Sequence, residues 1–203
     1  MKKISRLLLC FAVALVLGCS SPSEPGQSAS GSKQQNQLET GRVALQKMIP
    51  QARFWSQDAQ PIRLESEVLK DINGHDGKLG FWRAVFASPA KQKAETFTWS
   101  GMSGPDRGVS HGSEDSFTPT NRSTQPFDLN FLRVDTDKAF EVAQQHGGKQ
   151  LLVKEPTLPM KYMLDWDAQA NQLKWHVFYG GNDLSAKLTV VVNASTGEFM
   201  HKE

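Results

Sequence analysis

The stretch LKWHVFYGGNDLSAKLTVVVNASTGEFM, from Leu173 to Met200, determines the fold that the sequence predicts. Its first part has the two-residue period of a β-strand with one buried face. That buried face would consist of Leu173, Trp175, Val177 and Tyr179. A second apolar run, AKLTVVVN, begins at Ala186 and is rich in β-branched residues. We therefore predict two strands in this stretch.

The residues before this stretch predict one helix and one more strand. Asp135 or Thr136 is a plausible helix N-cap, and Gly147-Gly148 is typical of a helix end. Between them, an apolar helical face is formed by Ala139, Val142 and Ala143. The segment MKYMLDW from Met160 predicts a strand. The second half of the chain is thus expected to form a helix followed by three strands.

The first half of the chain repeats this order. An apolar helical spacing of Leu45, Met48, Ile49 and Ala52 predicts a helix over residues 38–49, with Pro50 interrupting it or starting a separate turn. Strands are expected over residues 62–69, 81–88 and 94–101. We therefore predict an α+β fold of two helix-plus-three-strand units, each a helix packed on a small antiparallel sheet. The units would span residues 38–103 and 127–203, joined by a polar linker over residues 104–126.

The N-terminus has the layout of a secretory signal peptide, with a basic start and a short apolar run up to Gly18. The motif VLGC, ending at Cys19, resembles the lipobox of bacterial lipoproteins. That resemblance implies cleavage after residue 18 and lipidation of Cys19, with residues 19–37 as a flexible Ser/Pro/Gly/Gln-rich tether. Ser20 implies an outer-membrane location facing the periplasm if the host is Gram-negative. The alternative is an ordinary signal peptide with a cysteine near its cleavage site.

Removal of this signal peptide changes the charge and the cysteine content. The full chain has a formal charge of +2, and loss of Lys2, Lys3 and Arg6 leaves 20 basic residues against 21 acidic ones. The mature chain therefore gives no electrostatic argument for nucleic-acid binding. Cys10 leaves with the signal peptide, and lipidation occupies Cys19, so neither a disulfide nor a thiol nucleophile is expected.

The second half also resembles PepSY-like domains of secreted and envelope proteins. The resemblance rests on the helix DTDKAFEVAQQHGG with Ala139 and Ala143, the aromatic strand LKWHVFYGG, and the closing strand with Asn193-Ala194-Ser195-Thr196-Gly197-Glu198. The first half would be a degenerate second copy. The resemblance implies a module that binds or restrains a partner, and it brings no catalytic residue or cofactor.

Candidate chemistry in the sequence is sparse. The nearest approach to a metal-ligand cluster is His111 with Glu114 and Asp115, but a Ser/Gly-rich loop orients ligands poorly, so no metal or cofactor is expected. Glu65 and Glu67 share a strand face, which is more typical of a solvated surface than of an acid/base pair. One Gly-x-Ser-x-Gly pattern is present, Gly108-Val109-Ser110-His111-Gly112, and it lies inside the segment predicted as a polar linker.

The aromatic residues are the most suggestive feature for binding. Trp82 and Trp175 are expected in the core, because each shares a strand face with other apolar residues. The candidate partner contacts are Trp99, Tyr162, Trp166 and His176. The core remains the alternative for each tryptophan.

The preferred function is non-enzymatic binding of a protein or peptide, by strand addition at a sheet edge or on an aromatic sheet face. A second hypothesis is a module that holds a lipid or a cell-wall fragment between helix and sheet. A third is an envelope hydrolase, which would need a pocket that joins two titratable groups from different elements. Under all three hypotheses, we expect the protein to be attached to the membrane through lipidated Cys19.

Overall fold

The protein is described by a computed structural model, which covers residues 35–181 and 184–203. The signal peptide, Cys19 and nearly all of the predicted tether lie outside the described residues. The first half of the described chain contains α1 (Gly41–Trp55), β1 (Gln60–Ser66), β2 (Phe81–Ser88), β3 (Lys93–Ser100) and β4 (Gly108–Ser116).

The second half begins with two short helical turns, Arg122–Thr124 and Leu129–Phe131. The elements that follow are α2 (Thr136–Ala143), the π-turn Gln144–Gly148, α3 (Lys149–Lys154), β5 (Met160–Asp167), β6 (Gln172–Tyr179), β7 (Leu188–Asn193) and β8 (Phe199–Lys202).

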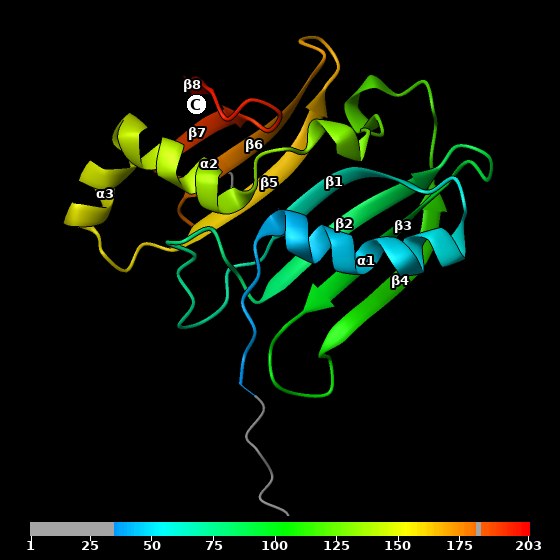
Figure 1. The fold of residues 1–203 in the computed structure, drawn as a ribbon, viewed down its shortest axis with the longest axis horizontal. Coiled ribbons are helices and arrows are strands. Elements are labelled where there is room, and N and C mark those ends of the chain that lie inside the picture. The colour runs from blue at the N-terminus through cyan, green and yellow to red at the C-terminus, as the bar shows by residue number, and fades with distance from the viewer. Residues whose placement is uncertain (1–34, 182–183) are drawn as a thin grey trace, which may run out of the picture. The chain divides into compact units, whose positions relative to one another are not determined.

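The eight strands in the described residues form one antiparallel sheet, in the order β4-β3-β2-β1-β5-β6-β7-β8 (Figure 1). The prediction of two helix-plus-three-strand units is therefore wrong. β1 pairs with β5 through Leu64 and Leu164 and the residues on either side, which joins the two halves into one continuous sheet. Both Leu64 and Leu164 are fully buried, so the joint lies in the middle of the core.

The two outer strands were not expected from the sequence. β4 lies inside the segment predicted as a polar linker over residues 104–126, and β8 follows the closing turn of the chain. From Ser110 to Ser116, every residue of β4 is exposed, so this strand lacks the alternation of apolar and polar residues that marks a half-buried strand. An edge strand can form without that signal, because its hydrogen bonds to β3 come from the backbone.

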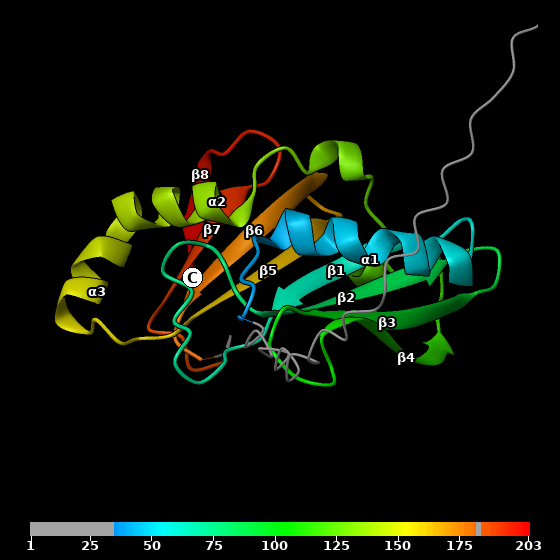
Figure 2. The same ribbon diagram turned by 60° about the horizontal axis from the view of Figure 1, so that its bottom comes forward.

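The helices lie on one face of the sheet, with α1 across β1–β4 and α2 across β6 and β7 (Figures 1 and 2). The core fills the space between these helices and the sheet, and its largest fully buried side chains include Trp82, Trp175, Tyr162, Phe86 and Phe97. In the described part of the chain, no α-helix covers the opposite face (Figure 2). We call it the open face.

Helix α1 runs through Pro50, although Pro50 was expected to interrupt it or to start a separate turn. A proline inside a helix cannot donate the backbone hydrogen bond to the carbonyl four residues earlier. Pro50 and Gln46 are both exposed, so water can reach the Gln46 carbonyl. Meanwhile Leu45, Met48 and Ala52 are buried under the helix, and this packing outweighs the loss of one hydrogen bond.

The N-termini of α1 and α2 meet at one buried carboxylate, that of Asp135. Its Oδ1 accepts hydrogen bonds from the backbone N–H groups of Thr136 (2.8 Å) and Arg42 (2.9 Å), and its Oδ2 accepts one from Thr40 Oγ1 (2.6 Å). The predicted N-cap role of Asp135 at the second helix is confirmed. The structure adds that the same side chain also satisfies a donor at the start of α1.

Two tryptophans anchor the helices to the sheet, one at the start of α1 and the other at the start of α2. Trp82 on β2 donates its indole N–H to the Glu39 carbonyl (3.0 Å), and Trp175 on β6 donates to the Val134 carbonyl (2.9 Å). Each acceptor lies two residues before the first residue of a helix. Both rings are fully buried, as the sequence predicted, and each satisfies its polar atom at a helix entrance.

Candidate functional site

A groove runs between the C-terminal half of α1 and the outer strands β3 and β4. Its volume is about 620 Å³, within the range of roughly 300–1,000 Å³ that is typical of ligand sites. We call it the edge groove, and its lining consists of Pro50, Gln51, Phe54, Trp55, Glu95, Phe97, Val109 and His111.

A β-bulge determines which side chains of β4 face this groove. The pairing of β3 with β4 shifts register between Glu95 and Phe97, so that Phe97 lies opposite His111 and Glu95 lies opposite Glu114. Gly112 and Ser113 together therefore take the place opposite Thr96, as expected for a bulge. As a result, His111 and Glu114 both lie on the helix-covered face of the sheet.

A His–Glu pair forms the polar end of the edge groove. His111 Nδ1 lies 2.5 Å from Glu95 Oε1, and the imidazole stacks on Phe97 with 5.7 Å between ring centroids. Glu95 is only 4% exposed, whereas the His111 side chain is 60% exposed. A buried carboxylate needs such a partner. The exposed part of the imidazole is available to a molecule that enters the groove.

The rim of the groove is aromatic. Phe54 is 96% exposed, and the neighbouring Trp55 donates its indole N–H to Glu114 (2.7 Å). Lys91 holds the other side of the indole, with its ammonium 4.8 Å from the ring centroid and 2.7 Å from the Trp55 carbonyl. Trp55 is therefore fixed in place, while Phe54 projects into solvent beside an apolar groove.

The outer edge of β4 borders the same groove. β4 is the terminal strand of the sheet, so on one side its backbone groups have no strand partner among the described residues. Natural edge strands are commonly protected by charged residues, proline or β-bulges. β4 has no lysine or proline, and its acidic residues Glu114 and Asp115 lie beyond the bulge, so the stretch before the bulge is the less protected part of the edge. The bulge at Gly112-Ser113 divides the edge into two short stretches, and Val109 and His111 lie in the first of them.

The structure places two of the four predicted contact residues deep in the core. Tyr162 is fully buried and donates its hydroxyl to the Gly74 carbonyl (2.7 Å). Burial raises the pKa of this hydroxyl well above its usual value, so Tyr162 stays protonated. Trp99 is buried, and Lys47 lies over its ring at 4.7 Å from the centroid. Both side chains serve packing in this fold.

The other two predicted residues lie on different elements and do not form one site. Trp166 is half-buried near the end of β5, and its ring lies 5.2 Å from that of Phe131. His176 is nearly buried on the open face, with Nε2 3.2 Å from Asp165 Oδ1. The structure therefore does not bring Trp99, Tyr162, Trp166 and His176 together.

Sequence reasoning missed the groove because its parts come from three separate elements. Phe54 and Trp55 are adjacent on a helix, so at most one of them can point to the core, and this signal could have marked an exposed aromatic residue. The sequence groups His111, Glu114 and Asp115 but predicts that they lie in a linker. Their strand, and the contact of His111 with Glu95, depend on pairing with β3.

The described residues contain no group of three or more His, Cys, Asp or Glu side chains arranged to hold a metal ion. In the same part of the chain, no helix has the length and apolar character needed to span a membrane. The lining of the edge groove contains no Ser, Thr or Cys hydroxyl or thiol that could act as a nucleophile beside the His–Glu pair.

Comparison with known proteins gives one structural relative. No known protein family and no curated protein matches this chain. Among solved structures, the chain is similar to the crystal structure of a candidate lipoprotein from Clostridium difficile 630, with 14% sequence identity and a TM-score of 0.52. The match covers 81% of this chain and 95% of that chain. At this identity, the similarity shows a shared fold and nothing more.

Proposed function

We propose that this protein is a lipid-anchored envelope protein that binds an extended peptide segment of a partner protein at the β4 edge. The observation that carries the proposal is the position of an unpaired edge strand beside an apolar groove with a fully exposed Phe54. Strand addition would pair the peptide backbone with β4, and alternate side chains of the peptide would enter the edge groove.

The groove also indicates the chemistry of the peptide. Phe54, Trp55 and Val109 offer contacts to an aromatic or aliphatic side chain, next to the buried ring of Phe97. The exposed imidazole of His111 offers a hydrogen bond at one end of the groove. Because side chains of a strand alternate between its two faces, the peptide should carry apolar residues at every second position. The PepSY-like resemblance of the second half agrees with a partner-binding role.

The geometry favours this function over the two alternatives. A lipid or cell-wall fragment between helix and sheet would need an enclosed cavity, whereas the edge groove opens along a strand edge. A hydrolase could use the His111–Glu95 pair as a base, but the described lining supplies no nucleophile. Ser110 is next to His111 in the chain, but it is not part of the groove lining, and its hydroxyl lies 2.6 Å from that of Thr98 on the neighbouring strand.

Selection from a random peptide library displayed on phage, against the full-length protein in detergent, tests this proposal. We expect the enriched peptides to share apolar residues at alternate positions. Replacement of Phe54 by serine should weaken their binding at least tenfold, because a central aromatic contact commonly contributes about 2 kcal/mol to an interface. Isothermal titration calorimetry with one selected peptide measures this loss of affinity.

Val153→Ser is the matched control, because Val153 is also an exposed apolar residue on a helix but lies on α3, outside the edge groove. Equal affinity of the Phe54→Ser and Val153→Ser proteins would rule out the groove as the binding site. Strand addition itself is tested by N-methylation of alternate peptide bonds of the ligand, which should abolish binding in one register only. Insensitivity to methylation in both registers would exclude pairing with β4.

We further propose that Cys19 carries the lipid anchor, which the VLGC motif supports by its resemblance to a lipobox. Several acyl chains on one residue hold a protein stably on a bilayer. In a Gram-negative host, Ser20 supports an outer-membrane location facing the periplasm. The Ser/Pro/Gly-rich segment after Cys19 would then hold the folded part away from the membrane.

Replacement of Cys19 by alanine is expected to move the protein from the membrane fraction to the soluble fraction and to abolish labelling with radioactive palmitate. Cys10→Ala is the control, because Cys10 lies within the proposed signal peptide and should leave both readouts unchanged. Palmitate labelling that persists in the Cys19→Ala protein would contradict lipidation at this position.

A further inference from the structure

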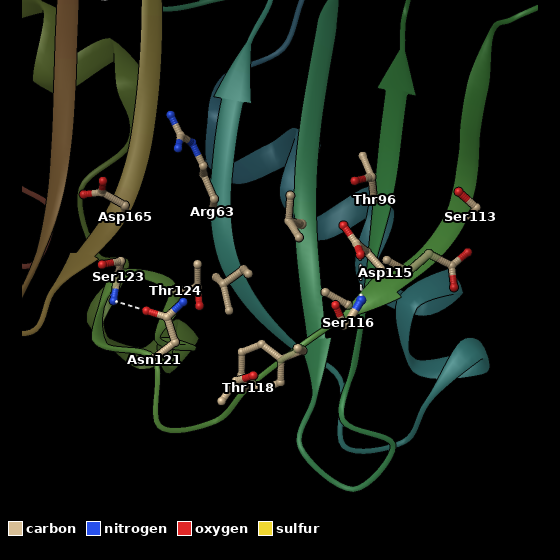
Figure 3. Close-up of a pocket in the computed structure, with 15 residues that line it drawn as sticks. Arg63, Thr96, Ser113, Asp115, Ser116, Thr118, Asn121, Ser123, Thr124 and Asp165 are labelled. Atoms are coloured by element: carbon tan, nitrogen blue, oxygen red, sulfur yellow. Dashed lines mark hydrogen bonds between the residues drawn. The ribbon is translucent and has the colours of Figure 1, made fainter.

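A second cavity lies on the open face, on the other side of the sheet from the edge groove. Its volume is about 540 Å³, and it extends from β5 across β1, β2 and β3 to β4 (Figure 3). The segment from Phe117 to Thr124 follows β4 and lines one end of the cavity. We call it the open-face pocket.

Hydroxyl and amide groups dominate the wall of this pocket. They belong to Thr96, Ser113, Ser116, Thr118, Asn121, Ser123 and Thr124. The Asn121 side chain accepts a hydrogen bond from the Ser123 backbone N–H (3.0 Å), which fixes the turn that carries three of these groups (Figure 3). A hydroxyl can both donate and accept, so such a wall matches a ligand that also carries many hydroxyl groups.

The charged groups of the pocket make it unfavourable for anions. Arg63 on β1 lies opposite Asp165 on β5, and Asp115 lies on β4 at the far side of the pocket (Figure 3). Glu95 also borders the pocket, but its carboxylate pairs with His111 in the edge groove. Arg63 is the one cation among the described lining residues and lies beside Asp165, so a further negative charge would be repelled at the Asp115 side of the pocket.

Asp165 stays ionised in this setting. Burial acts to raise its pKa, but a hydrogen bond from His176 and the charges of His176, Lys174 and Arg63 together lower the pKa below its usual value. An ionised carboxylate accepts strong hydrogen bonds from ligand hydroxyl groups. Asp115 and Asp165 thus provide acceptors at opposite sides of the pocket.

The floor of the pocket is a small apolar patch. A buried cluster of Ala87, Ala94 and Phe117 packs with Ile62 and Val85, and four of these five residues also line the pocket. The C–H face of a pyranose ring is apolar, while its rim carries hydroxyl groups. An apolar floor surrounded by hydroxyl, amide and carboxylate groups matches both surfaces of such a ring.

We propose that the open-face pocket binds a neutral saccharide, with Asp115, Asp165 and Arg63 as hydrogen-bonding partners of its hydroxyl groups and the patch around Phe117 under one ring. This site is separate from the edge groove, so the protein would contact a peptide and a glycan on opposite faces of one sheet edge.

The test is isothermal titration calorimetry of the full-length protein in detergent with four neutral tetrasaccharides, built from glucose, mannose, galactose and N-acetylglucosamine. At least one should bind, and Asp115→Ala should weaken that binding about tenfold or more, the loss expected when a hydrogen bond to a charged group is removed. Asp106→Ala is the matched control, because Asp106 is an exposed acid outside the pocket and close to the start of the same strand. The neutral tetrasaccharide that binds should also have a higher affinity than a tetrasaccharide of galacturonic acid, which is anionic.

Three results would overturn the proposal. The first is the absence of binding by all four neutral tetrasaccharides at about 10 mM. The second is an equal loss of saccharide affinity in the Asp115→Ala and Asp106→Ala proteins. The third is tighter binding of the anionic sugar than of the neutral ones. Thermal melting of both variants shows whether they are folded. The Phe54→Ser protein should bind the saccharide normally, so failure of peptide binding and failure of saccharide binding are distinguishable.

Discussion

Replacement of Asp135 by alanine is expected to lower the free energy of unfolding by about 3 kcal/mol. The loss of one N-cap costs about 0.5–2 kcal/mol, and Asp135 serves the N-termini of both α1 and α2. The change would also leave the buried Thr40 hydroxyl without its acceptor. For a domain of this size, the melting temperature should fall by roughly 10 °C.

Two further variants separate the cap from the negative charge. Asp135→Asn keeps one side-chain oxygen for the backbone donors, and the Thr40 hydroxyl can rotate to accept from the new amide, so we expect about half of the loss. Asp137→Ala removes an exposed acid from the same first turn of α2 and should change stability by less than about 0.5 kcal/mol. Urea unfolding followed by tryptophan fluorescence measures all three. Equal stability of the Asp135→Ala and Asp137→Ala proteins would refute the shared cap.

Replacement of Gly41 by alanine should destabilise the protein by about 2 kcal/mol, although alanine is the better helix former. Helix propensity alone predicts a gain of up to about 1 kcal/mol. A Cβ atom at Gly41, however, would lie 2.6 Å from Cη2 of Trp175 and 3.1 Å from Cη2 of Trp82. Both rings are fully buried and held by hydrogen bonds to the helix entrances, so neither can move without disturbing the core.

Gly112→Ala is the matched control for this substitution. A Cβ atom at Gly112 would meet nothing closer than the Thr96 carbonyl at 3.8 Å, which is an ordinary contact on an exposed strand. We expect its effect to stay within about 0.5 kcal/mol. Differential scanning calorimetry compares the two variants with the parent protein. A stabilised Gly41→Ala protein would show that the two tryptophans do not close tightly around the start of α1.

The candidate site was less predictable than the fold elements around it. The edge groove needs Phe54 from α1, Glu95 from β3 and His111 from β4, and no local pattern links these three positions. Trp99 and Tyr162 were candidate contacts because aromatic residues are common at interfaces. Each nevertheless shares a strand face with buried core residues, Phe97 for Trp99 and Leu164 for Tyr162, and the helices cover that face. Phe54 cannot be selected from the sequence, because a helical pattern marks the buried face of a helix more clearly than an exposed functional residue.

The sequence by itself determined the local elements of this protein. Apolar strand patterns located β1, β2, β3, β5, β6 and β7, and the N-cap signal offered Asp135 or Thr136 for the start of α2, where Asp135 is the cap. These features depend on residues within a few positions of one another, and over such short distances the side chains directly restrict the backbone conformation. The burial of Trp82 and Trp175 followed from the same alternation.

Only the tertiary structure decided how these elements combine. The pairing of Leu64 with Leu164 joins residues that are far apart in the chain, and it turned two expected sheets into one. β4 became a strand because β3 offered backbone hydrogen bonds, although its own side chains are exposed. Such pairing depends on the free energy of the whole assembled core, in which buried area outweighs the entropy of closing long loops, and no short stretch of sequence encodes that balance.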